Sequence, residues 1–237
     1  MKKVTIHQPD FMPWLGLFYK IYISDVFVIL DHVEMDVKNS AWLKRVKFFL
    51  NNKVEWVSIP LVRPKEGHML RIQNIEVAIE NKEFNKKKNQ IVNQYRKHPY
   101  YSEIEPIINK YFSKDSNLVC EKNIEFIKDI IERLDIDTKI IRSSTLNIST
   151  SKNQMNIDIV KKINGGVYIS GMGADGYQIS SDFEKQRLML EYSNFNADHY
   201  KYPQKNAKVF ESGLSVVDAL MNLGFNGVSK LLREQKL

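Results

Sequence analysis

Cysteine is almost absent from this sequence, and its scarcity excludes several kinds of protein. Cys120 is the only cysteine among 237 residues, so no disulfide can form within the chain. Such low use of cysteine fits a reducing compartment. Cysteine and histidine also never occur at the spacing of a zinc site. Cys120 lies at apolar helical spacing, and nothing beside it would activate a thiolate, so we expect it to pack inside a helix.

Long apolar runs are missing as well. The N-terminal stretch MKKVTIHQPD reaches polar residues at His7 and Gln8 before it could form the apolar core of a signal peptide. No run approaches the roughly 20 residues that span a bilayer. We therefore expect a cytoplasmic protein with no membrane insertion. Its 43% hydrophobic and 27% charged residues are typical of globular proteins, and residues 1–237 fit one α/β domain.

Acidic residues are too few to balance the basic ones, and the net charge is +7. Much of the excess lies in two short runs, Lys86–Lys88 and Arg96-Lys97. On a helix such runs form a solvated face, or they attract an anion such as a nucleotide diphosphate. Aromatic residues are not interleaved with the basic runs, so we do not expect nucleic acid as a partner. The oligomeric state stays open, a homodimer included.

The first thirty residues have the pattern of a strand, a helix and a second strand. Val4–Ile6 and Val26–Leu30 are the apolar strands, and the segment between them, opened by Pro13, has helical spacing. This βαβ pattern predicts an α/β fold with a mostly parallel, Rossmann-like sheet. Ligands of such sheets bind beyond the carboxyl ends of the strands. His7, Gln8 and Asp31 should therefore lie on one rim.

The rest of the chain predicts a hairpin addition and a helical middle segment. Its expected elements, in order, are strand-like runs 42–50 and 54–62 around an Asn51-Asn52-Lys53 turn, a strand in 69–79, three helical pieces in 83–134, a strand at 139–143, a helix at 153–163, a strand at 167–170, a strand within 188–195 and a helix at 216–223. Asp115-Ser116 is the predicted N-cap of the third helical piece, Gly165-Gly166 should end the helix 153–163, and Gly224 should stop the last helix. Residues 83–134 form either an insertion or a lid.

Three constellations could carry chemistry. His7 can serve as a general base, or bond to the backbone at a strand end. The loop from Ser170 to Tyr177 can bring backbone N–H groups close to an anion, or form a tight turn. It lacks the ending of a P-loop and the acidic partner of a dinucleotide site. Asp198–Gln204 combines polar and aromatic groups, which suit a sugar face or ordinary loop packing. No serine-hydrolase elbow is present, and no spacing argues for a metal site from the histidines, so we predict no metal ligands.

The same segments resemble the WbqC-like proteins of bacterial surface-polysaccharide gene clusters. The opening IHQPDFMPWLGLFYKI is similar to the family's first block, matching His7, Gln8, Pro9, Pro13, Trp14, Gly16 and Lys20. Further matches along the chain are Asp25, Asp31, Lys38, Trp42, Arg45, Tyr168, Ser170, Gly171, Tyr177, His199, Tyr202 and Gln204, and the closing LSVVDALMNLG. Lys44 and Tyr200 depart from the family's pattern, where asparagine and proline are expected.

The resemblance implies a role in glycan biosynthesis, beside enzymes that make nucleotide-linked amino sugars. We therefore expect an acyl- or aminoacyltransferase that acts on the amine of such a sugar, with an acyl or aminoacyl thioester as the candidate donor. The predicted catalytic residues are His7, Asp31 and Ser170. The predicted substrate-binding residues are Gln8, Trp14, Lys20, Lys38, Trp42, Arg45, Gly171, Tyr177, His199, Tyr202 and Gln204.

Two other functions stay open. A histidine after the first strand is also found in nucleotidyltransferases and ATP-dependent activating enzymes with a HUP-like sheet, although the second histidine of their motif is absent here. The third alternative is a sugar-binding component of a glycan assembly complex without catalytic activity.

Overall fold

A computed structural model describes residues 1–38, 41–65, 67–171, 178–196 and 199–234. The chain divides into two compact units. Unit 1 comprises Met1–Gln8, Gly16–His32 and Ile136–Asn196, and unit 2 comprises Pro9–Leu15, Val33–Asp135 and Ala197–Leu237. The long excursion into unit 2 between His32 and Ile136 contains the predicted helical segment. One domain over residues 1–237 remains a prediction.

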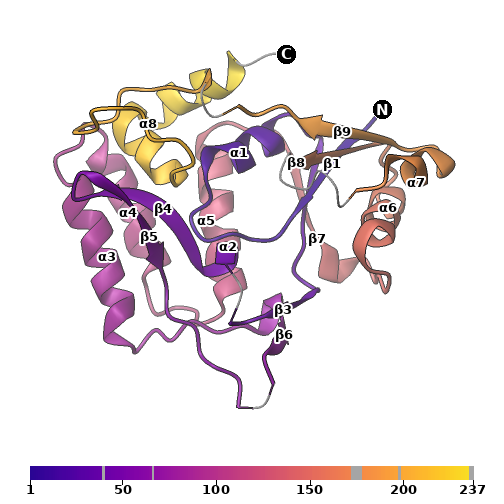
Figure 1. The fold of residues 1–237 in the computed structure, drawn as a ribbon, viewed down its shortest axis with the longest axis horizontal. Helices are drawn as coiled ribbons and strands as arrows, with labels where there is room; N and C mark the ends of the chain where they lie inside the picture. The colour runs from indigo at the N-terminus through magenta and orange to yellow at the C-terminus, as the bar shows by residue number, and fades with distance from the viewer. Residues whose placement is uncertain (39–40, 66, 172–177, 197–198, 235–237) are drawn as a thin grey trace. The chain divides into compact units, whose positions relative to one another are not determined.

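Unit 1 is built on a five-stranded sheet in the order β7-β2-β1-β8-β9, and every pairing is parallel (Figure 1). The strands are β1 (Lys3–His7), β2 (Val26–Ile29), β7 (Lys139–Arg142), β8 (Val167–Gly171) and β9 (Met189–Ser193). Each residue of VFVI in β2 is buried, as expected for an inner strand covered on both faces. The predicted α/β class with a parallel sheet is confirmed.

The connections of unit 1 are helical. They include α1 (Leu15–Tyr22), the short 3-10 turn η2 (Ser143–Thr145), α6 (Lys152–Lys162) and α7 (Ser180–Lys185). The prediction that Gly165-Gly166 ends α6 is wrong in detail. Asn164 takes the left-handed conformation there, with φ of 55°, because asparagine tolerates it better than most residues. Gly165 instead permits close packing, since a Cβ atom there would lie 2.6 Å from Val4 Cγ2.

Unit 2 combines helices with two small antiparallel sheets (Figure 1). Its helices are α2 (Ala41–Lys44), α3 (Lys82–Tyr95), α4 (Tyr101–Tyr111), α5 (Val119–Arg133) and α8 (Val216–Arg233), with the 3-10 turn η1 (Ile72–Asn74). Its strand pairs are β3 (Glu34–Asp36) with β6 (Met69–Arg71), and β4 (Arg45–Leu50) with β5 (Lys53–Ser58). The three helices α3, α4 and α5 confirm the helical middle segment.

The hairpin prediction is confirmed at its turn and corrected at its start. Asn51 and Asn52 both have positive φ, at 52° and 60°, as a tight hairpin turn requires. The first strand begins at Arg45, because the preceding residues 41–44 form a helical turn. The buried face of the hairpin packs on α3, where the rings of Phe48 and Tyr95 lie 6.2 Å apart.

Three further predictions about unit 2 need correction. The strand expected over 69–79 ends at Arg71 and is followed by a 3-10 turn. The N-cap position of α5 is occupied by Leu118, which makes no side-chain cap hydrogen bond. Asp115 accepts a hydrogen bond from the Ser113 hydroxyl, and Ser116 Oγ accepts one from the Leu118 N–H, so neither predicted residue occupies the N-cap position. The last helix is interrupted at Gly224 and then continues to Arg233, so Gly224 makes a kink.

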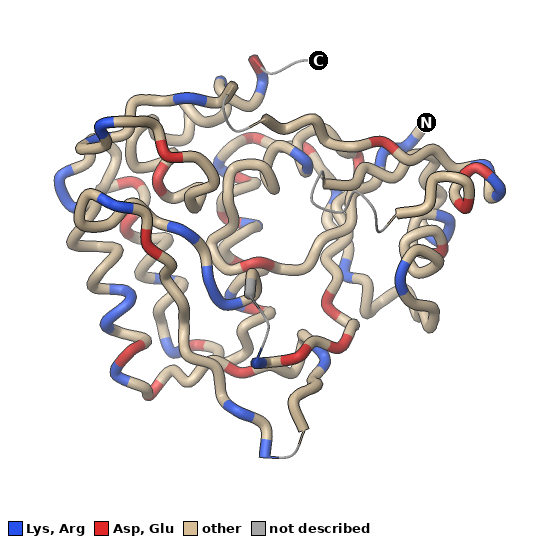
Figure 2. The backbone as a smooth tube through the Cα atoms, viewed as in Figure 1, with Lys and Arg blue, Asp and Glu red and all other residues tan. Residues whose placement is uncertain are grey.

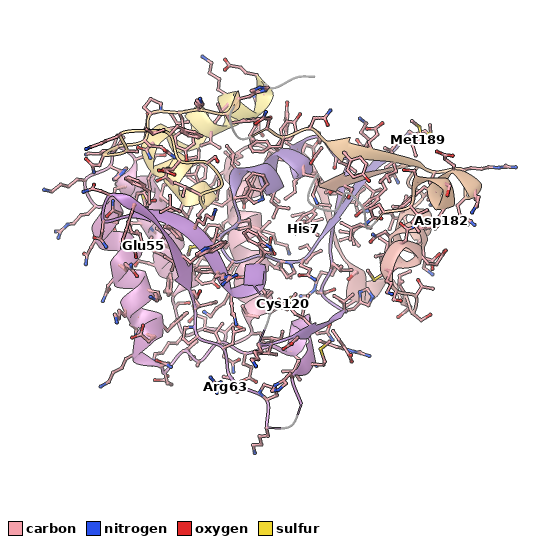
Figure 3. All side chains as sticks on the ribbon, in the orientation of Figure 1. His7, Glu55, Arg63, Cys120, Asp182 and Met189 are labelled. Carbon is pink, nitrogen blue, oxygen red and sulfur yellow. The ribbon has the colours of Figure 1, made fainter. Side chains whose placement is uncertain are left out.

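Burial agrees with these assignments. Cys120 is fully buried in α5, as predicted (Figure 3). Among the described residues, no helix is both long and apolar enough to cross a membrane.

We expect Gly224→Ala to lower the free energy of unfolding by about 3 kcal/mol. Gly224 has φ of 68°, and an added Cβ atom would lie 2.6 Å from the Tyr100 ring. With ψ of 177°, Gly224 lies in a backbone region that essentially only glycine adopts, which costs another residue about 1–3 kcal/mol, and overpacking adds about 1–3 kcal/mol. Urea denaturation followed by circular dichroism measures the change.

Gly213→Ala is the matched control. Gly213 has φ of 71°, but no described atom lies within 4 Å of an added Cβ atom. We expect it to cost only the backbone term, about 1–2 kcal/mol. Equal losses for the two variants would contradict the packing of Gly224 against Tyr100.

Candidate functional site

The carboxyl edge of the parallel sheet gathers the residues predicted to carry chemistry. In chain order the strands are arranged third, second, first, fourth, fifth, so the direction of winding reverses between β1 and β8. Ligands of doubly wound sheets bind beyond the strand ends at this reversal. His7 ends β1, Ser170 lies near the end of β8, and Asp31 follows β2, the neighbour of β1. The structure therefore places all three predicted catalytic residues along one edge of unit 1.

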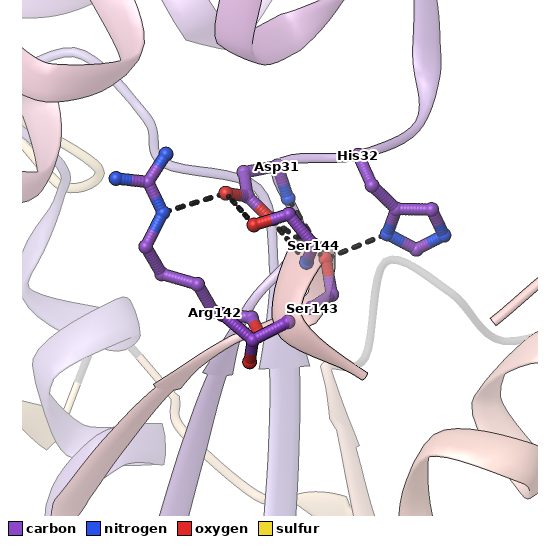
Figure 4. Close-up of polar contacts among 6 residues, drawn as sticks. Asp31, His32, Arg142, Ser143 and Ser144 are labelled. Carbon is purple, nitrogen blue, oxygen red and sulfur yellow. Dashed lines mark hydrogen bonds and ion pairs between the residues drawn. The ribbon is translucent and has the colours of Figure 1, made fainter. Parts of the chain in front are cut away.

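Asp31 is the anchor of this edge. Its side chain is fully buried and accepts four hydrogen bonds (Figure 4). One oxygen accepts from Arg142 Nε at 2.7 Å and from Ser144 Oγ at 2.8 Å. The other accepts from the Ser144 N–H at 2.8 Å and from Ser143 Oγ at 3.0 Å. Burial by itself would raise the pKa of Asp31, but the hydrogen bonds from Arg142, Ser144 and Ser143 lower it below the usual 3.8.

This environment makes Asp31 a poor proton acceptor. A carboxylate with a lowered pKa that already accepts four hydrogen bonds has little tendency to take a proton. Its role is to hold other groups in place, and the closest of these is His32.

His32 is joined to Asp31 through a serine hydroxyl. His32 Nδ1 lies 2.7 Å from Ser143 Oγ (Figure 4). The Ser143 hydroxyl has one proton, and it donates that proton to the Asp31 carboxylate, which can only accept. Ser143 Oγ must therefore accept from His32, so Nδ1 carries a proton, and Nε2 is the nitrogen that can act as a base.

His7 is a second imidazole, at the end of β1 (Figure 3). Its Nδ1 lies 3.0 Å from the Gln8 carbonyl oxygen, which can only accept, so Nδ1 is again the donor. The ring is partly exposed but surrounded by protein on most sides. This burial, followed by the positive charge of Lys20, lowers the pKa of His7 to about 3. His7 is therefore neutral throughout the physiological range.

Lys20 supplies a charge close to the same strand end. Its side chain is buried, at 4% exposure, and its Nζ donates to the Ile6 carbonyl oxygen at 3.4 Å. Its positive charge is near enough to lower the pKa of His7, so this lysine contributes a positive potential at the end of β1.

The end of β8 has a polar group that the described residues leave without a hydrogen-bond partner. Ser170 is buried, and its hydroxyl has no hydrogen-bond partner among the described residues. A Cβ atom added to Gly171 would meet no described atom within 4 Å. Tyr177 lies outside the described residues. An unsatisfied buried hydroxyl at the reversal point is a group that a ligand or water could satisfy.

The remaining predicted residues belong to unit 2. Tyr202 and Gln204 donate to the carboxylate of Asp218, at 2.8 Å and 3.2 Å, and Tyr95 donates to its other oxygen at 2.8 Å. Burial raises the pKa of Asp218 despite these bonds. Tyr202 and Gln204 therefore hold an interior carboxylate. The other predicted residues in this unit are Trp14, Lys38, Trp42, Arg45 and His199, of which Lys38, Trp42, Arg45 and His199 are exposed.

Four residues at the sheet edge were not predicted from the sequence: His32, Arg142, Ser143 and Ser144. The signal that could have found them is the carboxyl-end rule, since Arg142-Ser143-Ser144 ends a strand that the sequence does predict. Among the described residues, no group of three or more His, Cys, Asp or Glu side chains is arranged to hold a metal ion.

Comparison with known proteins shows which family the chain resembles. The model of the WbqC-like protein family matches residues 8–230. The chain belongs to the WbqC-like family. A Mycobacterium tuberculosis relative, named uncharacterized protein Rv1507c, is 24% identical over 226 residues, which cover 94% of this chain and 95% of the relative. No solved structure matches the chain.

We expect Asp31→Asn to lower the free energy of unfolding at pH 7 by about 2–3 kcal/mol. The substitution removes the charge and turns an amide N–H₂ toward groups that donate. Removing one partner of a fully buried pair costs about 3–5 kcal/mol, and the partly exposed Arg142 side chain reduces that loss. The pKa of Asp31 is lowered in the folded state, so its contribution exists above about pH 4 and is lost as the pH falls through the lowered value. Urea denaturation between pH 3 and 7 measures both effects.

Asp25→Asn is the control for this prediction. Asp25 also accepts a hydrogen bond in unit 1, from the Lys3 N–H, but it is exposed. The loss should be below about 1 kcal/mol. If Asp31→Asn were no more costly than Asp25→Asn, the anchoring role of Asp31 would be wrong.

Proposed function

We propose that this WbqC-like protein is an enzyme of surface-glycan biosynthesis that transfers an acyl or aminoacyl group to the amine of a nucleotide-linked amino sugar. The observation that carries the proposal is a pair of histidines at the carboxyl ends of two neighbouring parallel strands. His7 ends β1, beside the reversal point of the sheet, and His32 follows β2 with the anchored Asp31 carboxylate behind it. Family membership supports the biosynthetic setting.

The attacking amine must lose a proton as it bonds to the acyl carbon, so the reaction needs a base. His32 fits that role, because its basic Nε2 is defined by the Ser143 contact, and the Asp31 charge stabilises the imidazolium through Ser143. The new bond joins the sugar nitrogen to the acyl carbon, and the bond from that carbon to the donor sulfur breaks. The proton passes from the base to the departing thiolate.

His7 has a different role in this proposal. A base with a pKa near 3 is weak at neutral pH, so His7 serves better as a hydrogen-bond acceptor that orients the amine. Asp31 is a positioning residue, since it acts through Ser143. Ser170 and Gly171 contribute the hydroxyl and an open backbone beside the acceptor.

The charges at the edge suit the substrate. Tetrahedral intermediates of acyl transfer develop an oxyanion, and nucleotide sugars carry a diphosphate. Lys20 supplies positive potential at the end of β1, where either group would be stabilised, whereas the charge of Arg142 is offset by its ion pair with Asp31. Gln8 adds an amide beside His7.

We expect purified protein to convert dTDP- or UDP-amino sugars in the presence of acyl or aminoacyl thioesters, detected by mass spectrometry of the sugar product. His32→Asn should lower kcat/KM by about 10²–10⁴-fold, the usual contribution of general base catalysis. Asparagine keeps a donor for Ser143 and removes Nε2, so the fold should survive. The fall in rate at acidic pH, which reports protonation of His32, should disappear in this variant. It cannot report His7, whose pKa is about 3.

His68→Asn is the control, because His68 is exposed and lies in unit 2. It should leave kcat/KM within about twofold of the wild type, as most surface substitutions do. Absence of product with every pair of donor and acceptor, or equal rates for His32→Asn and the wild type, would contradict the proposal.

One observation favours a second candidate. The strand order and a histidine that ends β1 are also compatible with nucleotidyl transfer or ATP-dependent activation. Release of pyrophosphate from ATP or CTP, with a matching adenylylated or cytidylylated product, would support it. If neither activity occurs but amino sugars bind, a non-catalytic sugar-binding role is preferred.

A further inference from the structure

Unit 2 exposes two tryptophans that the chemistry at the sheet edge does not use. Trp42 on α2 is 51% exposed, and Trp56 on β5 is 43% exposed. Their ring centroids lie 5.5 Å apart in an edge-to-face arrangement. Large aromatic side chains rarely remain in water together unless they serve a contact, because burying each would be strongly favourable.

Two cations lie over the same aromatic group. Arg45 Cζ is 4.7 Å from the Trp56 ring centroid, and Lys47 Nζ is 5.5 Å from it. Lys47 is directly opposite Trp56 in the β4–β5 register, and Arg45 lies two residues along the same face of β4. Figure 2 shows the basic residues that follow one another into β4. We call Trp42, Trp56, Arg45 and Lys47 the tryptophan platform.

The described residues place no carboxylate in an ion pair with the platform. No ion pair joins Arg45 or Lys47 to a carboxylate anywhere in the described part of the chain. Glu55, the acidic residue next to Trp56, pairs instead with Lys53 at 3.3 Å and with Gln90. The positive field also reaches Lys44, whose pKa is lowered first by burial and then by Arg45.

Hairpin stability does not account for this arrangement. Cation–π contacts at exposed positions are worth about 0.5–1 kcal/mol each, which explains why Arg45 and Lys47 lie over Trp56. It does not explain why Trp42 presents half of its surface to solvent beside them. The contact with Trp56 restrains the Arg45 side chain, and its planar guanidinium can bind an anion with two parallel hydrogen bonds.

We propose that the tryptophan platform is a binding site for a saccharide that carries a negative charge. The apolar face of the sugar ring packs on Trp42, and its phosphate or carboxylate binds Arg45 and Lys47. Binding at this site needs no catalytic activity, so it can be tested independently of the acyl-transfer function.

The three tryptophans give a direct test. In ¹H–¹⁵N spectra of the full chain, their indole N–H signals can be assigned by single Trp→Phe substitutions. Titration with glucose 1-phosphate or glucuronic acid should move the Trp42 and Trp56 signals and leave Trp14 unchanged. Glucose should bind at least tenfold more weakly, and raising the salt concentration should weaken binding of the charged sugars. The two charged probes distinguish a phosphate from a carboxylate as the anion.

Matched charge changes complete the experiment. Arg45→Gln and Lys47→Gln should each weaken binding of the charged sugar by fivefold or more. Lys53→Gln, which removes a cation from the same hairpin at its turn, should leave binding unchanged. Unshifted Trp42 and Trp56 signals at 10 mM of both charged sugars would overturn the proposal. Equal weakening by Lys53→Gln, or binding of UDP without binding of either charged sugar, would overturn it as well.

Discussion

The burial of one carboxylate determines how the carboxyl edge of unit 1 is built. Asp31 has no exposed surface, so its charge is tolerated only because four donors surround it. All four come from the segment Arg142–Ser144, which ties the end of β7 to the end of β2. The same bonds leave Ser143 Oγ without a spare proton, and this fixes which nitrogen of His32 is basic. A structural requirement in the interior therefore sets the protonation of a group at the rim.

Each unit buries a carboxylate, and these two carboxylates are stabilised by different kinds of hydrogen-bond donor. In unit 1 the donors include a guanidinium group, and the pKa of Asp31 is lowered. In unit 2 the donors to Asp218 are two tyrosine hydroxyls and an amide, and burial keeps its pKa raised. Neutral donors compensate burial less well than a charged one. Asp31 thus remains a fixed negative charge, which suits the support of a histidine, whereas Asp218 joins segments of an interior.

Much of the fold follows from sequence patterns, because strands of apolar β-branched residues and helices with a periodic apolar face are local signals. The βαβ start, the asparagine hairpin turn and the helices of 83–134 were predictable in this way. Local corrections arose at helix ends. Asn164 takes the conformation expected of Gly165, and α5 begins after Leu118 without the side-chain cap that Asp115-Ser116 was expected to supply. The positions of His7 and Asp31 followed from the carboxyl-end rule, and Ser170 was singled out by the glycine-rich loop that follows its strand. The donors to Asp31 come from 111 or more residues away in the chain, and no local pattern indicates such a pairing.

The tautomer of His32 tests the central claim most directly, because it depends on Asp31, Ser143 and His32 together. Long-range ¹H–¹⁵N correlation spectra at pH 7.5 distinguish a protonated Nδ1 from a protonated Nε2. We expect the Nδ1–H form in the wild type, and a shift toward the Nε2–H form, which is preferred by free histidine, in Ser143→Ala. A wild-type His32 that carries its proton on Nε2 would contradict the hydrogen-bond chain from Asp31 to the rim.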